Sequence, residues 1–357
     1  MKLKTEKKWM RPQKWEAAKK GRWSLLLVAL MLLVSACGTP APAGQTEAEA
    51  SPKAGQGAET RTADTGTGET VVVQTNGREM VFPEAPKRAV TLNQHVTEVM
   101  LALGLEDKMV GTAYLDDEIL PRFKAAYDKI PVLADKYPSK EVLMAAEPDF
   151  VYAGWKSAFG DKGVGSMEEL EKAGIKSYLH ESSNKPTPSI DDVFSDIQNV
   201  GRIFRVEDRA DALIAKMKGE MEQIAGKLGN VDKPLPVFVY DSGEEQPFTA
   251  ANNYMTALIQ MAGGKNIFDD IQKGWAEVSW EEVVNRDPQI IVIVDYGDKT
   301  AEQKRSLLLG KRELADVSAI RNQRFVILPL SAAAEGVRAP IALNILAEGL
   351  YPEKFTQ

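Results

Sequence analysis

Several predicted buried strands are followed by polar or aromatic side chains that could hold a small ligand. Arg338 lies in a glycine-bearing loop after one such strand, and its guanidinium could bind a carboxylate or catecholate oxygen through two parallel hydrogen bonds. Aromatic rings at other strand ends could stack on a large flat ligand. For each candidate, ordinary surface or core packing is the alternative. The candidate ligand-binding residues are Asn93, Gln94, His95, Tyr114, Trp155, Lys156, Ser242, Phe248, Tyr296 and Arg338, with His180 and Glu244 beside them.

Histidine and cysteine are too scarce for a site that binds a bare divalent metal. Such sites usually gather several imidazoles or thiolates, whereas this chain has two histidines and one cysteine. We therefore predict no resident metal and no cofactor. A metal site built from carboxylates alone is the alternative, although no clustered spacing of acidic residues indicates one. His95 has two alternative roles, as a hydrogen-bonding loop residue or as a contact to the iron of haem or of an intact chelate.

No sequence motif indicates catalysis. The chain lacks a G-x-S-x-G elbow, a Walker A loop, H-E-x-x-H, and a G-x-G-x-x-G that follows a strand. Ser242, in YDSGEE, lacks the first glycine of a nucleophile elbow and has no evident base. We predict that the protein is not an enzyme. A lipid-anchored hydrolase is the remote alternative, which turnover in a substrate screen would reveal.

Two phrases of the same layout indicate the elements that position the candidate residues. They are SKEVLMAAEPDFVYA from Ser139 and SWEEVVNRDPQIIVI from Ser279. In each, a glutamate follows the serine two residues later, Glu141 or Glu281, and a proline follows nine residues later. A serine cap, an acid in the first turn and a proline before an apolar run predict a helix start, a helix stop and a core strand. The repeat suggests two similar lobes.

Each lobe is predicted to be α/β. Apolar strands alternate with helices in RAVTL, VTEVMLALGL and MVGTAY from Arg88 onward, and in LPVFVYD, NYMTALIQMAGG and PQIIVIVDY from Leu235 onward. This alternation is typical of parallel sheets covered by helices. Ligands of such sheets bind beyond the carboxyl ends of the strands, where the candidate residues lie. The run TVVVQTNGREMVF predicts a hairpin that turns at Asn76 and Gly77.

A long amphipathic segment separates the two copies. Apolar residues recur at helical spacing from Val206 to Leu228, without proline, and the segment ends at Gly229 and Asn230. A helix of about 24 residues is about 36 Å long, enough to connect two lobes. An ordinary surface helix is the alternative.

The N-terminus has the composition of a secretion signal. Residues 2–22 are basic, and WSLLLVALMLLV is an apolar core of roughly a dozen residues, shorter than the about 20 that a membrane span needs. The sequence VSAC, ending at Cys37, resembles the bacterial lipobox, in which the signal is cut before the cysteine and its sulfur is lipidated. Acylation of Cys37, as by palmitate, would anchor the protein to a membrane. Residues 38–69 contain almost no bulky apolar side chain and predict a flexible tether.

The chain that follows this segment is acidic. After Ala36 it holds 35 Lys and Arg against 49 Asp and Glu. Binding to nucleic acid requires the opposite sign, because phosphates must be neutralised. We therefore predict no nucleic-acid partner.

Together these features resemble the helical-backbone class of substrate-binding proteins for ABC importers, which deliver ferric siderophores, haem or cobalamin. Phrases that carry the resemblance include PKRAVTLNQHVTEVMLALGLEDKMVGTAY, EVLMAAEPDFVYAG, YDSGEEQPFTAANN, AGGKNIFDD and WAEVSWEEVVNRDPQIIVIVDYGD. The resemblance covers roughly residues 80–350 and implies two Rossmann-like lobes joined by one long helix, with a ligand cleft between them. It also implies that Glu141 and Glu281 dock into arginine pockets on the permease. Their alternative role is to complement helix dipoles, worth about 0.3 to 1 kcal/mol each.

On this basis we predict a monomeric receptor, lipid-anchored on the extracytoplasmic face of the cell membrane. It would capture an iron chelate and deliver it to an ABC permease dimer with its ATPase. A ferric siderophore is the leading cargo, and cobalamin, haem and a cofactor precursor are the alternatives. The predicted parts are a signal peptide (1–36), lipidated Cys37 with its tether (37–69), an N-terminal lobe (70–205), an interlobe helix (206–229) and a C-terminal lobe (230–357).

Overall fold

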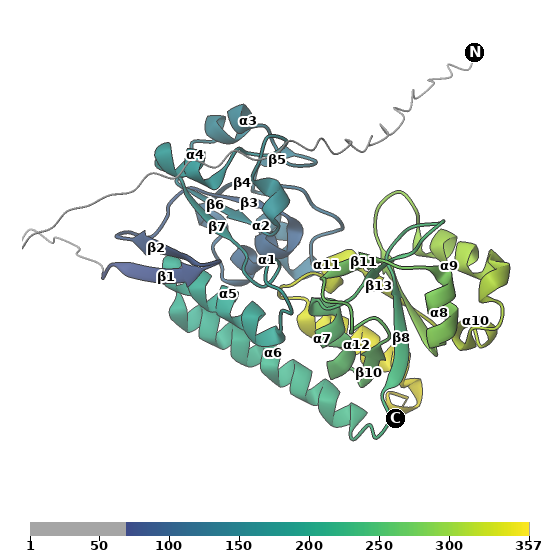
Figure 1. Cartoon of the computed structure of the whole chain (residues 1–357). Helices are drawn as coiled ribbons and strands as arrows, with labels where there is room; N and C mark the ends of the chain where they lie inside the picture. The colour runs from purple at the N-terminus through teal and green to yellow at the C-terminus, as the bar shows by residue number, and fades with distance from the viewer. Residues whose placement is uncertain (1–68, 357) are drawn as a thin grey trace, which may run out of the picture. The chain divides into compact units, whose positions relative to one another are not determined.

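Two parallel β-sheets, one in each lobe, form the framework of the protein (Figure 1). The computed structural model describes residues 69–356. The first sheet has the order β5-β4-β3-β6-β7, and its strands are β3 (Ala89–Leu92), β4 (Met109–Ala113), β5 (Val132–Ala134), β6 (Phe150–Ala153) and β7 (Lys176–Leu179). The second has the order β10-β8-β12-β13, with β8 (Leu235–Tyr240), β10 (Gly264–Asn266), β12 (Ile290–Asp295) and β13 (Phe325–Pro329). The predicted α/β fold with two lobes is confirmed.

Helices cover these sheets, which explains why the central strands are apolar without alternation. Every residue of β3 and β6 is buried, as are the first five residues of β12. The longer helices of the first lobe are α1 (Gln94–Ala102), α3 (Lys140–Ala145), α4 (Met167–Lys172) and α5 (Ile190–Ile203). Those of the second are α7 (Tyr254–Met261), α8 (Trp280–Arg286), α9 (Ala301–Gly310) and α12 (Ala339–Leu350). Three single-turn helices are α2 (Lys124–Tyr127), α10 (Ser318–Arg321) and α11 (Leu330–Ala333).

Two antiparallel ribbons flank the parallel sheets. The predicted hairpin is confirmed as β1 (Val71–Thr75) and β2 (Arg78–Phe82), with positive φ at Asn76 (49°) and Gly77 (70°), as a tight primed turn requires. The second ribbon pairs β9 (Phe248–Ala250) with β11 (Trp275–Glu277) and was not predicted. Its three-residue strands are too short to show a period-two pattern.

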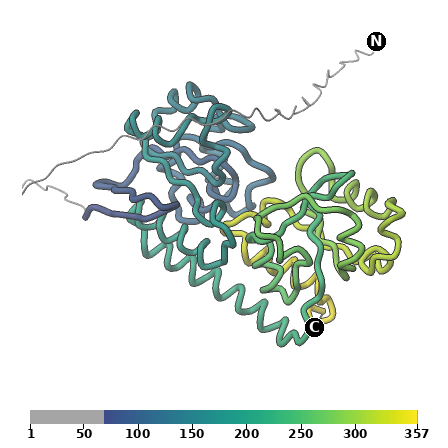
Figure 2. Tube along the Cα trace, in the orientation of Figure 1, coloured from purple at the N-terminus to yellow at the C-terminus, as the bar shows by residue number. Residues whose placement is uncertain are grey.

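The long helix α6 (Glu207–Leu228) lies between β7 and β8 in the chain, within one residue of its predicted ends. Figure 2 shows it running along one side of the molecule, where it packs against α5 of the first lobe and α12 of the second. Its buried residues follow helical spacing, as predicted, and are Ala210, Met217, Met221, Ile224 and Leu228.

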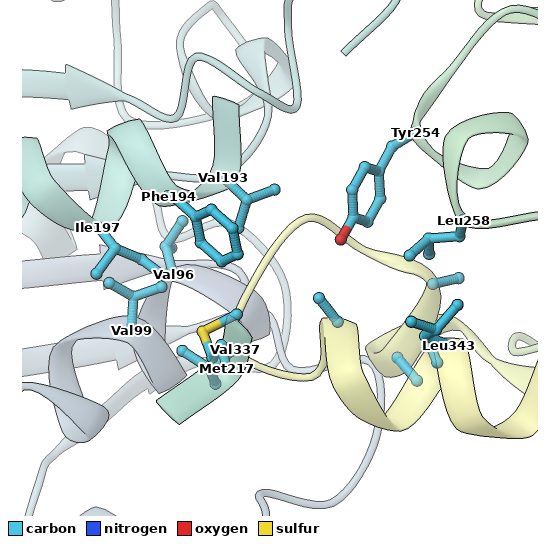
Figure 3. Packing of buried hydrophobic residues seen from close by; sticks show 14 of the residues in the cluster. Val96, Val99, Val193, Phe194, Ile197, Met217, Tyr254, Leu258, Val337 and Leu343 are labelled. Carbon is cyan, nitrogen blue, oxygen red and sulfur yellow. The ribbon is translucent and has the colours of Figure 1, made fainter. Parts of the chain in front are cut away.

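The largest hydrophobic core is shared by the two lobes. One buried cluster includes Phe194 of α5, Met217 of α6, Val337 of the loop before α12, and Leu343 of α12. Figure 3 shows these side chains converging from elements of both lobes. Each fully buried side chain of this size contributes about 1.5–3 kcal/mol relative to exposure. The lobes therefore belong to one compact unit.

The membrane-related predictions fall elsewhere in the chain. Across residues 69–356, no helix combines the length and apolar character required to cross a bilayer. The predicted signal peptide, Cys37 and nearly all of the predicted tether lie outside the described residues.

Candidate functional site

Glu141 and Glu281 lie at equivalent positions, in the first turns of α3 and α8. The Ser139 hydroxyl caps α3 by accepting a hydrogen bond from the N–H three residues on, at 3.4 Å. Ser279 caps α8, and Glu282 completes the predicted capping box. Both Glu141 and Glu281 are exposed. The hydrogen bond from Ser139 lowers the pKa of Glu141, so this carboxylate is charged and open to solvent.

Asn93 and Gln94 tie together the loops at the carboxyl end of the first sheet. Asn93 has a φ of 95°, and its Oδ1 accepts hydrogen bonds from the backbone N–H groups of Gly154 (3.2 Å) and Trp155 (3.3 Å). Gln94 Oε1 accepts from the N–H of Asp116 at 3.1 Å and from the next N–H at 2.8 Å. Both side chains are buried, and these bonds hold the adjoining loops in place.

Aromatic side chains gather at the same end of the first sheet. Tyr114 has a φ of 61°, and its ring centroid lies 4.6 Å from that of Tyr137. The Lys136 ammonium lies 4.4 Å from the Tyr114 ring centroid, within the range of a cation–π interaction. Asp116 follows two residues later, and burial raises the pKa of its carboxyl. Trp155, after β6, is half-buried.

The carboxyl end of the second sheet carries a hydrogen-bonded group around Asp241. Tyr296 Oη donates to Asp241 Oδ2 at 2.6 Å, and Ser242 Oγ donates to the same oxygen at 2.9 Å. Lys304 Nζ donates to the Asp241 carbonyl at 2.7 Å. Burial, and then the bond to Asp241, raise the pKa of Tyr296, which therefore stays protonated at neutral pH. Of these four residues, sequence reasoning had selected Ser242 and Tyr296.

The antiparallel ribbon places a second aromatic pair beside this group. Phe248 and Trp275 stack with ring centroids 5.7 Å apart and planes 13° apart. The charge of Asp116, in the first lobe, is among the causes that raise the pKa of Tyr296 in the second.

A seam of polar contacts joins the lobes near His95. Ser183 Oγ donates to Glu335 Oε2 of the second lobe at 2.9 Å and lies 3.2 Å from His95 Nε2. The His95 side chain is 3% exposed, and its ring packs against Trp155 at 4.8 Å. Burial, and then the neighbouring His180, lower the pKa of His95 well below its usual value. His95 is therefore neutral in this structure.

His180 lies behind His95 and belongs to the first-lobe interior. Its Nδ1 lies 2.6 Å from the Tyr152 hydroxyl. Its Nε2 approaches Asp196 Oδ2 at 3.4 Å, yet this nitrogen has no hydrogen-bond partner with acceptable geometry within the described chain. Burial lowers the pKa of His180, so the contact with Asp196 is not an ion pair at neutral pH.

The Arg338 guanidinium is bonded to a carboxylate of the other lobe in this structure. Its Nε donates to Glu98 Oε2 at 2.7 Å, and its Nη2 donates to Glu98 Oε1 at 2.6 Å. Arg338 comes from the loop before α12 and Glu98 comes from α1. The two residues thus form a two-bond ion pair between the lobes.

Two pockets flank these groups. One, of about 500 Å³, lies in the first lobe, and its lining includes Leu115, Asp117, Ile119 and Tyr127 but none of the ten candidate ligand residues. Another, of about 530 Å³, lies beside the hairpin and is lined in part by Lys156. Each is built from the first lobe alone. Within residues 69–356, no group of three or more His, Cys, Asp or Glu has the arrangement of a metal site.

The comparison with known protein families decides which family this fold represents. Residues 90–332, which include all but the first residue of the two sheets, match the periplasmic binding protein family. The chain belongs to this family. A solved periplasmic binding protein from Veillonella parvula has 34% sequence identity and a TM-score of 0.74, over 79% of this chain and 98% of that one.

Two curated relatives and a further solved structure are also similar to this periplasmic binding protein. The ABC transporter substrate-binding lipoprotein YvrC of Bacillus subtilis is 25% identical over 94% of this chain and 98% of the relative. The vitamin B12-binding protein of Vibrio parahaemolyticus is 23% identical over 58% of this chain and 70% of the relative. The haem-binding protein RhuT of Roseiflexus, 23% identical with a TM-score of 0.62, covers 75% of this chain and 99% of its own and shares the fold.

Membership of the periplasmic binding protein family agrees with the resemblance found in the sequence, and the relatives of the chain include an ABC transporter substrate-binding lipoprotein and a vitamin B12-binding protein. Its relatives are substrate-binding proteins, which agrees with the prediction that it is not an enzyme. The roles predicted for individual ligand and docking residues stay predictions.

Sequence reasoning missed Glu98, Ser183, Asp241 and Glu335, which organise the site. One signal was available for Glu98, which lies one helical turn after Gln94 in an otherwise apolar segment. An acid on a buried helix face needs a partner, and this need predicts a contact without naming the partner.

Proposed function

We propose that the protein is a monomeric, lipid-anchored receptor that captures a ferric siderophore between its lobes and delivers it to an ABC permease dimer with its ATPase. Cys37 would carry the lipid, placing the receptor on the extracytoplasmic face of the membrane. The lipoprotein relative YvrC supports this location. The predicted parts, from the signal peptide (1–36) to the C-terminal lobe (230–357), belong to the same proposal.

The observation that carries the proposal is the pair of aromatic groups at the carboxyl ends of the two sheets. The first lobe contributes the pair Tyr114 and Tyr137, and the second lobe contributes the pair Phe248 and Trp275. Rings presented from both sides suit a large ligand with flat or apolar faces, because each face can be covered at once. A large chelate fits this description better than a small sugar or amino acid does.

The charges near these rings favour a neutral or cationic chelate over a polyanionic one. Asp116 and Asp241 stand at the two strand ends, each with one lysine nearby, Lys136 and Lys304, so these groups carry no excess of positive charge. Arg338 is already paired with Glu98. A ferric tris-catecholate centre is a trianion, whereas a ferric tris-hydroxamate centre is neutral. The trianion would find no excess of positive charge to balance it, so the hydroxamate is the favoured siderophore type.

Cobalamin is the second candidate. Several relatives are named as vitamin B12-binding proteins, at 23–24% identity over about 70% of their length. Its flat corrin ring with peripheral amides also suits aromatic faces beside carboxylate and hydroxyl groups.

Native mass spectrometry of the protein purified from its host would test the cargo, since it reports a retained ligand and its metal. Tryptophan fluorescence quenching would then rank a ferric hydroxamate, a ferric catecholate, haemin and cyanocobalamin. We expect saturable quenching by the hydroxamate and affinity for the catecholate lower by tenfold or more. Tighter binding of the catecholate would refute the charge argument, and binding of none of the four would refute the proposed cargo class.

The docking role of Glu141 and Glu281 has a separate test. The double variant Glu141→Ala, Glu281→Ala should abolish uptake of the bound chelate and change its affinity less than about threefold, because both residues are exposed on helix ends. Glu168→Ala with Glu302→Ala is the matched control, since these are exposed first-turn glutamates of α4 and α9. Equal losses of uptake in both double variants would contradict specific docking.

A further inference from the structure

Arg338 uses its whole guanidinium to join the second lobe to the first. Besides the two bonds to Glu98, its Nη2 donates to the carbonyl of Glu118 at 2.6 Å and its Nη1 donates to Ser331 Oγ at 2.9 Å. Ser331 in turn donates to Asp117 Oδ2 at 2.8 Å. Two parallel bonds fix both the distance and the angle of a guanidinium–carboxylate pair.

The ion pair is shielded from water at both ends. The side chain of Glu98 is 1% exposed and that of Arg338 is 10% exposed. Glu98 Oε1 also accepts a hydrogen bond from the Leu120 N–H at 2.9 Å, which anchors the carboxylate within its own lobe. A buried, fully bonded pair of this kind is screened little by salt and holds one geometry.

The segment that carries Arg338 packs closely against the first lobe. Val337 is buried in the shared core, which Figure 3 shows beside Met217. At Gly336, a Cβ atom would lie 3.1 Å from the Cβ of His95, so the backbone already touches this side chain. The apolar contacts favour burial but do not fix one orientation of the lobes relative to each other. The two-bond ion pair does fix this orientation.

We propose that Glu98 and Arg338 form an interlobe clamp that sets the spacing of the two lobes before any ligand binds. The consequence for transport rests on the proposed docking function, because the same clamp would then fix the spacing of Glu141 and Glu281. Both members of the clamp are positioning residues. Under this proposal, Arg338 does not contact the ligand.

Interlobe distances in the unliganded protein test the clamp directly. Spin labels at Val142→Cys and Asn285→Cys, exposed positions on α3 and α8, report the distance between lobes in the full chain with Cys37→Ser. Pulsed dipolar spectroscopy should give one narrow distance for the otherwise unchanged protein. A broad distribution in that protein would overturn the clamp at once.

The decisive variant removes the charges without leaving one unpaired. Glu98→Gln with Arg338→Met keeps an acceptor for Leu120 and replaces the guanidinium by an apolar chain. Replacing a buried ion pair in this way often leaves stability unchanged, so we expect a near-normal unfolding midpoint but a distance distribution about twice as wide or wider. If the double variant kept both the unfolding midpoint and the narrow interlobe distance distribution of the parent protein, the clamp would be overturned.

Arg338→Lys decides the question if the double variant does not fold. Lysine keeps the charge but cannot make two parallel bonds, so the distribution should widen by an intermediate amount. An unchanged distance together with a tenfold loss of affinity for a ferric hydroxamate would show instead that Arg338 contacts ligand. Because no permease is present, failure of the docking proposal leaves these measurements unaffected.

Discussion

Glu335 of the second lobe accepts a hydrogen bond from the Ser183 hydroxyl of the first lobe at 2.9 Å. When Glu335 is ionised, the single hydroxyl proton of Ser183 goes to Glu335, so His95 then donates to Ser183 from Nε2 across their 3.2 Å separation. Burial raises the pKa of Glu335 to about 7, and the negative charge of Asp196 adds to this increase. The seam between the lobes therefore contains a carboxyl group that titrates near neutrality.

The free energy of unfolding should fall as pH rises through this range. The Glu335 carboxyl has a usual pKa of 4.5 when exposed and about 7 in the folded protein. Between these values the folded state binds more protons, so its advantage is complete below about pH 4.5 and is lost as pH approaches 7. The full difference in pKa corresponds to at most about 3.4 kcal/mol. Urea unfolding at pH 5.5 and pH 8 measures it.

Glu335→Gln is the control, because glutamine still accepts the bond from Ser183 and does not titrate. We expect the wild-type protein to lose about 1–3 kcal/mol more than this variant between the two pH values. His95 and His180, whose pKa values are lowered, favour unfolding as pH falls, but both are present in both proteins and cancel. Parallel pH profiles for the two proteins would contradict the assignment.

Tyr296→Phe should destabilise the second lobe. The change removes the 2.6 Å bond to Asp241 Oδ2 but leaves the bond from Ser242 to the same oxygen. Loss of one bond to a buried carboxylate costs about 1–3 kcal/mol. Ser242→Ala should cost less, because its bond is longer, and the double variant should cost more than the two single changes added together. Additive losses in denaturant unfolding would show that the two hydroxyls act independently.

The strands, the hairpin and α6 could be predicted because each depends on neighbours in sequence. Asn76 and Gly77 specify the turn of the hairpin, and the apolar spacing of α6 specifies its buried face. The interlobe pair of Glu98 with Arg338 could not be predicted, because its members lie 240 residues apart. Arg338 carried the chemistry expected of an anion-binding residue, and only the folded chain shows that the anion is another side chain.

Ser279→Ala tests the repeated phrase that marks the two lobes. The change removes an N-cap whose capping box with Glu282 is complete, so we expect a loss of about 1 kcal/mol in the free energy of unfolding. Ser139→Ala should cost less, because the Ser139 cap bond is 3.4 Å long and the box is incomplete. Chemical denaturation of both variants provides the comparison. A larger loss at Ser139 would reverse this ranking of the caps.

Gly154 and Gly219 should respond in opposite ways to the same change to alanine. At Gly154 a Cβ atom would lie 2.2 Å from His95 Cε1 and 3.1 Å from Asn93 Cβ. Because His95 is buried at the interlobe seam, it cannot turn away without disturbing its contacts, and we expect a loss of about 1–3 kcal/mol.

Gly219 lies inside α6, and apart from its chain neighbours and the backbone of its own helix, no heavy atom lies within 4 Å of the position a Cβ would take. Gly219→Ala should therefore stabilise the protein by about 0.5–1 kcal/mol, since alanine favours the helix. Thermal unfolding of the two variants should bracket that of the wild-type protein. A wild-type midpoint for Gly154→Ala would mean that the His95 ring can leave the seam at little cost, and that the seam is looser than its contacts indicate.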